Sequence, residues 1–146
     1  MNKILCIVGM TGSGKSEVAK FFVDRGFGYF RFGQPVLDEA IKRGSVNEET
    51  EREIRNGFRK QYGMAAMAIL NKPIINELLQ KGNVLGDGLY SWDEYKYLKE
   101  KFGENLIVLA VCASPKVRYS RLENRKYDPE KDKQANYVDI LRKIWA

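Results

Sequence analysis

Eight residues near the start of the chain have the types and spacing of a phosphate-binding loop. They fit the pattern G-x-x-x-x-G-K-S/T and read Gly9-Met10-Thr11-Gly12-Ser13-Gly14-Lys15-Ser16. In such a loop the backbone N–H groups and a helix N-terminus point at one anion, and glycine lets the backbone approach it closely. Lys15 would neutralise the β- and γ-phosphates, and the Ser16 hydroxyl would hold Mg²⁺. The residues expected to bind phosphate are Gly9, Thr11, Gly12, Ser13, Gly14, Lys15 and Ser16.

The segments on either side of this loop fit the same motif. Residues 3–8 are a short apolar run typical of a buried strand, and residues 15–25 carry apolar side chains on one helical face. The motif requires a strand, a glycine loop and a helix in this order. The alternative, a glycine-rich turn that binds nothing, is therefore disfavoured.

A carboxylate follows a second apolar run. Asp87 ends residues 83–87 and is followed by Gly88. At the carboxyl end of a strand, an aspartate can contact Mg²⁺ or a substrate. An Asp-Gly hairpin turn is the alternative, but a helix is expected from Ser91, with Glu94 completing a capping box, and this argues against a hairpin.

Three arginines have the spacing of one helical face. Arg118, Arg121 and Arg125 stand at i, i+3 and i+7 in a segment, 116–125, with a helical pattern. Guanidinium groups arranged in this way can clamp phosphates during phosphoryl transfer. A solvated surface is the alternative. Beside a phosphate-binding loop the functional interpretation is favoured, with Arg121 and Arg125 as the best candidates.

Candidate acceptor-binding residues follow from position alone. Arg31 and Gln34 lie at the end of an expected strand, 29–32, whose carboxyl edge faces the same crevice as Asp87. Arg59 lies on a strongly charged helix, 47–61, and could line a substrate pocket. An ordinary charged helix explains Arg59 equally well.

The remaining pattern alternates strands and helices, which is typical of a parallel α/β sheet. Residues 106–112 form the longest apolar run and are expected to be the central strand. Pro73 is expected to kink or restart a helix over 64–81. The other expected elements are helices at 35–43, 91–101 and 137–145 and a loop at 127–134.

The composition limits the classes of function. The chain has 146 residues, enough for one domain, with no histidine and a net charge of +6. Histidine-based acid–base catalysis and histidine metal ligands are therefore excluded. The charge suits an anionic partner, but the basic residues are dispersed, which favours a small polyphosphate over nucleic acid.

The sequence also indicates a compartment. No apolar run is long enough to span a bilayer, and no secretory signal precedes the first strand. Cys6 and Cys112 lie in strands expected to be buried and form neither a disulfide framework nor a zinc motif. We therefore expect a cytoplasmic protein without a membrane partner.

The chain resembles the nucleoside and nucleotide kinase group of P-loop proteins, and it looks closest to the adenylate-kinase-like and dephospho-CoA-kinase-like proteins of archaea and bacteria. A motor-type ATPase usually carries adjacent acidic residues after its third strand, whereas Gly88 follows Asp87 here. The segments that carry the resemblance are 7–19, Phe32-Gly33-Gln34, 62–68, Gly86-Asp87-Gly88 and 113–122.

The resemblance implies a three-layer α/β/α P-loop NTPase fold with the parallel strand order 2-3-1-4-5. It implies an acceptor-binding segment over 33–75, a lid over 121–136, and transfer of the γ-phosphoryl group of ATP–Mg²⁺ to a nucleoside monophosphate or similar small molecule. Asp87 would orient the acceptor or a metal-bound water. Arg121 and Arg125 would clamp the transferring group.

The chain departs from this group at its end. Such kinases continue into a fifth strand and a final helix, whereas this chain ends at Ala146. Either the chain is truncated, or its lid and base site are remodelled, and the strand order expected here is 2-3-1-4. A second hypothesis is an ATP-binding or slow ATPase module that has no acceptor and acts through a partner.

Overall fold

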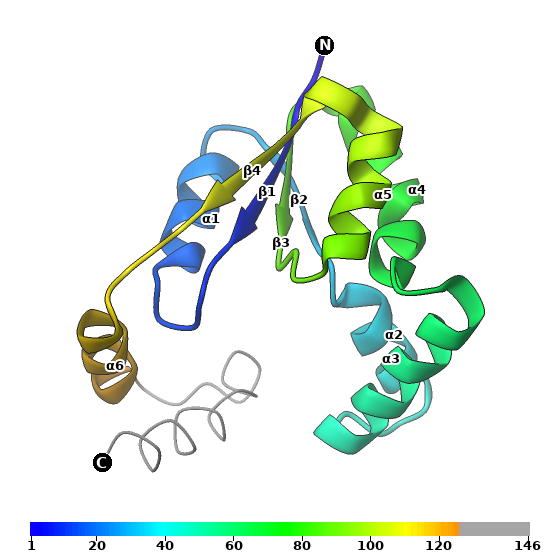
Figure 1. The fold of residues 1–146 in the computed structure, drawn as a ribbon, viewed down its shortest axis with the longest axis horizontal. Helices are drawn as coiled ribbons and strands as arrows, with labels where there is room; N and C mark the ends of the chain where they lie inside the picture. The colour runs from blue at the N-terminus through cyan, green and yellow to red at the C-terminus, as the bar shows by residue number, and fades with distance from the viewer. Residues whose placement is uncertain (126–146) are drawn as a thin grey trace.

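A four-stranded parallel sheet with helices on both faces organises the chain (Figure 1). The structure is a computed structural model that describes residues 1–125. The expected loop at 127–134, the helix at 137–145 and most of the 121–136 lid lie outside these residues. The strands are β1 (Ile4–Val8), β2 (Gly28–Arg31), β3 (Val84–Asp87) and β4 (Leu106–Ala110).

The strand order is β2-β3-β1-β4, which confirms the fold and the order expected from the sequence. The helices are α1 (Lys15–Val23), α2 (Gln34–Lys42), α3 (Glu48–Tyr62), α4 (Ala66–Lys81), α5 (Trp92–Phe102) and α6 (Pro115–Asn124), with a 3-10 turn, η1 (Gly103–Asn105), before β4.

The two faces of the sheet carry different helices. α1 lies on one face, where Leu5, Ile7 and Leu85 pack with Ala19 in a small apolar cluster. α4 and α5 lie on the opposite face and enclose the larger core (Figure 1). α2 and α3 lie beyond the carboxyl ends of the strands, beside the carboxyl edge of the sheet (Figure 1).

The register of the sheet aligns three residues at this carboxyl edge. Asp87 of β3 pairs with Ile7 of β1 on one side and with Arg31 of β2 on the other. Residues that pair in a parallel sheet project from the same face. Asp87 and Arg31 therefore lie on the face of the sheet that α1 covers. Asp87 adjoins β1, the strand that leads into the phosphate-binding loop.

A glycine permits close packing one residue before Asp87. A Cβ atom on Gly86 would lie 2.7 Å from Cζ of Phe30 and 3.1 Å from Cε2 of Phe32. The two rings pack against each other with centroids 5.0 Å apart. This packing fixes β2 beside β3 and thereby fixes the position of Asp87.

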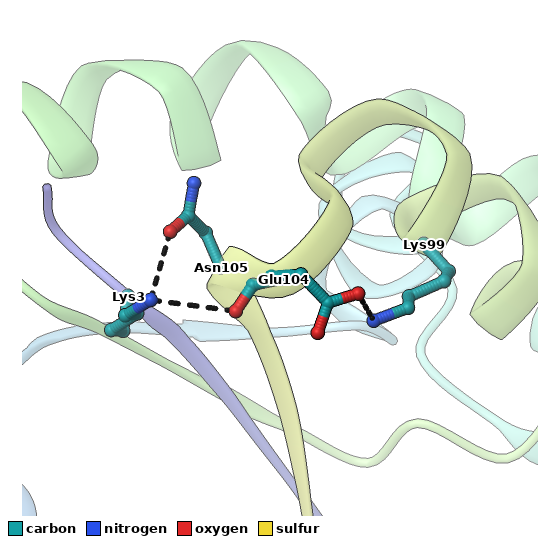
Figure 2. A network of polar contacts seen from close by, with 4 residues as sticks. All are labelled: Lys3, Lys99, Glu104 and Asn105. Atoms are coloured by element: carbon teal, nitrogen blue, oxygen red, sulfur yellow. Dashed lines mark hydrogen bonds and ion pairs between the residues drawn. The ribbon is translucent and has the colours of Figure 1, made fainter.

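Polar contacts hold the opposite end of the sheet (Figure 2). Lys3 Nζ donates to Asn105 Oδ1 at 3.0 Å and to the carbonyl oxygen of Glu104 at 3.4 Å. The Glu104 carboxylate pairs with Lys99 of α5 at 2.9 Å. These contacts tie the start of β1 to the turn before β4, far from the carboxyl edge.

Two expectations about burial were wrong. Within residues 1–125 the 106–112 segment is an edge strand, and Ile107, Val108 and Leu109 are 46%, 40% and 37% exposed. Cys6 is buried as expected, but Cys112 is exposed. An apolar run reports strand propensity, whereas burial also requires a neighbouring strand and covering helices.

Two helices show details that the sequence left open. The charged helix α3 contacts the core through Ile54, which is only 2% exposed. α4 continues through Pro73 as one helix, so of the two expected effects of this proline the restart does not occur. Among residues 1–125, no helix has the length and apolar character needed to cross a membrane.

Asn71 of α4 fixes the segment after β2. Its side chain is 3% exposed, and Nδ2 donates to the carbonyl oxygens of Phe32 at 3.1 Å and Met67 at 2.7 Å.

We expect Asn71→Ala to reduce the free energy of unfolding by about 1–3 kcal/mol, because a buried carbonyl loses its donor. Unfolding in urea measures this free energy. The control Asn76→Ala, at an exposed position of the same helix, should change the free energy of unfolding by less than about 0.5 kcal/mol.

Candidate nucleotide and acceptor site

The phosphate-binding loop joins β1 to α1 at the carboxyl edge of the sheet. Gly12 and Gly14 have φ values of +80° and +104°, a region that other residues rarely adopt. Gly14 caps α1, and its carbonyl oxygen accepts from the N–H groups of Glu17 and Val18. The loop therefore presents backbone N–H groups at the positive end of a helix dipole.

Lys15 lies across this loop. Its Nζ donates to the carbonyl oxygen of Gly9 at 2.8 Å. Burial lowers the pKa of Lys15, and the negative charge of Asp87 partly opposes this effect. The Asp87 carboxylate, at the carboxyl end of β3, is therefore close enough for its charge to act on the lysine of the loop.

Two serines of the loop fit a phosphate and a metal ion. The Ser13 hydroxyl is enclosed and has no hydrogen-bond partner among residues 1–125, so a phosphate oxygen would satisfy it. Ser16, the second residue of α1, is exposed. In residues 1–125 no three acidic, histidine or cysteine side chains cluster as metal ligands. A Mg²⁺ ion here would therefore rest on Ser16, the nucleotide phosphates and water.

Helix α6 braces the loop from the other side. Arg121 Nη1 donates to the carbonyl oxygens of Gly12 and Ser13, both at 3.1 Å. A Cβ atom on Gly12 would lie 2.8 Å from the carbonyl oxygen of Arg118, so this glycine permits the close contact. Arg121 thus reaches the loop, as a phosphate clamp requires.

The three arginines of α6 have different surroundings. Arg118 is 9% exposed, and its Nε donates to the carbonyl oxygen of Ala113 at 3.2 Å. Arg125 is the exposed C-cap residue of the helix. Arg118 therefore supports the turn that begins α6, while Arg121 lies against the loop.

Asp87 is held by an aromatic hydroxyl. Tyr29 donates its phenol proton to Asp87 Oδ2 at 3.0 Å. Burial and the Asp87 carboxylate raise the pKa of Tyr29, so the phenol stays protonated and keeps donating. The pKa of Tyr90 is also raised, first by burial and then by Asp87, while Arg31 acts in the opposite direction. Arg31, Asp87 and the two phenols therefore form one polar group.

Gln34 lines a cavity together with Tyr29 and Arg31 of this group. Gln34 Nε2 donates to Asp38 Oδ1 at 2.8 Å on its own helix. The cavity, of about 730 Å³, lies beside β2 between α2 and α4. Asp87 and Arg59 are not among the residues that line it. Tyr29 and Arg31 therefore belong to both places, whereas Gln34 lines the cavity and Arg59 does not.

The charge of Arg59 acts on Glu94, a residue that the sequence assigned only to a helix cap. Arg59 Nε is enclosed and has no partner among residues 1–125. Glu94 of α5 is 4% exposed, and burial raises its pKa to about 7, an effect that Arg59 opposes and Asp93 strengthens. The cap itself is present, because the Ser91 hydroxyl accepts from the Glu94 N–H at 3.5 Å.

Sequence reasoning missed Tyr29, Tyr90 and Glu94. Tyr29 is one aromatic residue of an expected strand, and a glutamate three residues after a serine is typical of a cap. No feature of the sequence indicates that Glu94 is buried.

Comparison with known proteins places the chain in a family. A family model described as an AAA domain matches residues 5–142. The UPF0200 protein PH1008 of Pyrococcus horikoshii is 38% identical over 143 residues, which cover 96% of this chain and 77% of that protein. The chain belongs to the AAA domain family and to the UPF0200 proteins. The UPF0200 protein of Thermococcus onnurineus is 36% identical over 145 residues, covering 97% of this chain and 77% of its own length.

Solved structures share the fold of this AAA domain. A gluconokinase from Sinorhizobium meliloti has a TM-score of 0.51 at 18% identity, covering 92% of this chain and 71% of its own. A shikimate kinase from Bacteroides thetaiotaomicron has a TM-score of 0.51 at 14% identity, covering 97% and 76%. These similarities show a kinase-like P-loop fold, which confirms the resemblance to P-loop kinases.

The raised pKa of Glu94 gives a stability prediction. Below pH 4.5, the ordinary pKa of a glutamate, the Glu94 carboxyl group is neutral in both the folded and the unfolded chain. Between pH 4.5 and about pH 7 it remains protonated in the folded chain and is ionised in the unfolded chain. Stability should therefore fall as the pH rises through this window. Glu94→Gln should raise the free energy of unfolding at pH 8 by roughly 2–3 kcal/mol and leave it unchanged near pH 4.

Chemical unfolding at the two pH values measures the difference. Glu100→Gln, on an exposed position of α5, should show the same stability as the parent chain at both. If the difference in the free energy of unfolding between Glu94→Gln and the parent is the same at pH 4 and pH 8, the raised pKa of Glu94 is contradicted.

Proposed function

We propose that this protein is a phosphotransferase that moves the γ-phosphoryl group of ATP–Mg²⁺ to a nucleoside monophosphate or a similar small molecule. The observation that carries the proposal is the position of Asp87 at the carboxyl edge of the sheet, in register with the end of β1, where its charge acts on Lys15. A nucleotide-binding module needs only the loop and its lysine. A carboxylate held at this edge by Tyr29 adds a group that can position an acceptor.

The proposed step needs only groups on this edge. The bond between the γ-phosphorus and the bridging oxygen of ATP breaks, and a new bond forms to an oxygen of the acceptor. Lys15 stabilises the negative charge on the phosphoryl oxygens, and Arg121 and Arg125 clamp the transferring group. Asp87 orients the acceptor and takes the proton where the acceptor oxygen belongs to a hydroxyl group. Ser16 would hold Mg²⁺, which would supply positive charge to neutralise the phosphates.

The acceptor site of the proposal comprises Arg31, Asp87 and Arg59, in and beside the 33–75 segment that contains α2, α3 and much of α4. Gln34 joins this site when its side chain leaves Asp38, to which its amide donates on the same helix. A cytoplasmic location is part of the proposal, supported by the free thiols of Cys6 and Cys112.

The test is a phosphoryl-acceptor screen with ATP–Mg²⁺. Its arms are nucleoside monophosphates, dephospho-CoA, gluconate and shikimate, with ADP release and labelled product both measured. We expect phosphorylation of one acceptor class. ADP release that no acceptor accelerates would overturn the proposal and favour the ATPase module that acts through a partner.

Lys15→Ala should abolish transfer while the fold survives. Loss of the ammonium group removes the charge at the β- and γ-phosphates, so we expect turnover to fall by roughly 10³-fold or more. Lys20→Ala provides the matched control, because this lysine is exposed on the same helix. Turnover by Lys15→Ala within tenfold of the parent, with a normal circular dichroism spectrum, would contradict the role.

Arg125→Ala and Arg121→Ala should have different effects. If Arg125 acts on the transferring group, its loss should lower turnover by about 10³-fold and change the Kd for ATP only slightly. Arg121 also holds two loop carbonyls, so its loss should weaken ATP binding as well as turnover. Titration calorimetry and steady-state kinetics separate the two. An equal loss of binding and turnover in Arg125→Ala would count against its role.

A further inference from the structure

A cavity follows the free edge of β2. Within residues 1–125, β2 is the last strand of the sheet and has a neighbouring strand on one side only. The cavity, of about 730 Å³, lies along this strand between α2 and α4. α4 passes β2 in the opposite direction, because a Cβ atom on Gly28 would lie 3.1 Å from Cδ2 of Leu78, while Asn71 Nδ2 donates to the carbonyl oxygen of Phe32 at 3.1 Å. The strand edge is therefore flanked by a helix on each side.

The backbone of β2 offers unused hydrogen-bonding groups to this cavity. The N–H groups of Gly28 and Phe32 donate to carbonyl oxygens in and next to β3, at 2.9 Å and 3.0 Å. Successive residues of a strand direct their backbone groups to opposite edges, so the N–H and C=O groups of Tyr29 and Arg31 point away from β3. Both residues line the cavity, and no acceptor among residues 1–125 reaches their N–H groups.

A buried amide supplies one more unused group. Asn71 lines the cavity and is 3% exposed. Its Nδ2 donates to two backbone carbonyl oxygens, which fixes the orientation of the amide. No donor among residues 1–125 reaches its Oδ1. A buried acceptor without a donor is costly, so a ligand that brings an N–H group into the cavity would be stabilised.

One wall of the cavity is apolar. Leu70, Pro73 and Ile74 of α4 have the i, i+3 and i+4 spacing of one helical face, and Phe58 of α3 extends this wall. The lining residues of α3 and α4 carry no charge. Ile74 is 38% exposed, so a ligand that covers it would remove apolar surface from water.

The opposite wall, on α2, carries a lysine without a partner. Asp38 accepts from Gln34 at 2.8 Å, and Glu39 pairs with Arg43 at 2.9 Å. Lys42 also lines the cavity and has no ion-pair or hydrogen-bond partner among residues 1–125. A free ammonium group at one end of the cavity favours a ligand with an acidic group at that end.

The spacing of these groups selects an extended peptide. Backbone groups recur on one edge of a strand at every second residue, which is the spacing from Tyr29 to Arg31. Gln34 and Lys42 are the two ends of α2, about 12 Å apart, and about four extended residues span this length. A second copy of this chain would meet a collision, because its own α2 and α4 flank the same edge.

We propose that this cavity binds an extended, acidic segment of a partner protein, which adds to the sheet as a strand beside β2. The main-chain bonds would supply affinity, and the apolar wall and Lys42 would supply specificity. The inference does not rest on the proposed function, since it uses the edge of β2 and neither the phosphate-binding loop nor Asp87.

Peptide titration followed by NMR tests the docking site without any measurement of activity. The probes are the acetylated and amidated peptides Val-Thr-Val-Thr-Glu-Glu and Glu-Glu-Thr-Val-Thr-Val, because a strand can add in either direction. We expect one probe to bind with a Kd of about 1 mM or tighter. Binding should slow the hydrogen exchange of the Tyr29 and Arg31 amides. The Phe30 amide, which faces β3, should exchange slowly with or without peptide.

Two modified probes test the strand pairing. One form of the better probe is N-methylated at its valines and the other at its threonines. The form that loses the N–H groups directed at β2 should bind roughly tenfold more weakly or worse, and the other form should bind as the unmodified peptide does.

Variants of the protein test the two walls. Ile74→Glu should weaken binding by roughly tenfold or more, because it places a carboxylate in the apolar wall. Asn76→Glu adds the same charge at an exposed position of α4 outside the cavity and should bind as the parent chain does. Lys42→Ala should weaken binding by about two- to fivefold, with Lys60→Ala on α3 as its control. Should Ile74→Glu fail to fold, Ile74→Ala replaces it, with an expected loss of roughly threefold or more.

The other outcomes overturn the proposal. Failure of both probes to bind at about 1 mM would do so, as would binding that leaves the exchange of the Tyr29 and Arg31 amides unchanged. Amide signals of these two residues that shift with protein concentration alone would assign the edge to a second copy. Equal binding of both N-methylated forms would indicate a pocket for apolar side chains that does not use the strand edge.

Discussion

The parallel register at the carboxyl edge of the sheet is the constraint on which the site depends. It sets Asp87 between Ile7 and Arg31, so the strand that precedes the phosphate-binding loop and the strand that carries Arg31 both adjoin the carboxylate. Parallel strands bring all their carboxyl ends to one edge, and this is why α/β sheets bind ligands there. Tyr29 then fixes the carboxylate by a hydrogen bond from the same edge strand.

The loop is positioned from two directions. α1 begins directly after Gly14 and supplies the helix dipole, while Arg121 of α6 holds the carbonyl oxygens on the other side of the loop. By donating to two carbonyl oxygens, Arg121 stabilises the loop conformation and places a positive charge against the loop.

Much of the fold was predictable because the relevant signals are local. The glycine loop, the alternation of strands and helices and the Ser91 cap depend on residues close together in the chain, and the structure confirms them. The errors concern position in the sheet. The 106–112 run predicted a central strand, but it lies at the edge of the sheet within residues 1–125, and Cys112 is exposed. The hydrophobicity of a strand can be read from its own residues, whereas the strands that flank it depend on the topology of the whole sheet.

The sequence by itself predicted the phosphate-binding loop, because the types and spacing of its glycines, Lys15 and Ser16 specify a local backbone conformation. Only the tertiary structure decided which distant side chains lie near it. It placed Arg121 against the loop, put Gln34 in a cavity that Arg59 does not line, and buried Glu94. The physical reason is that packing between helices determines burial, and burial determines which carboxyl group titrates near neutral pH.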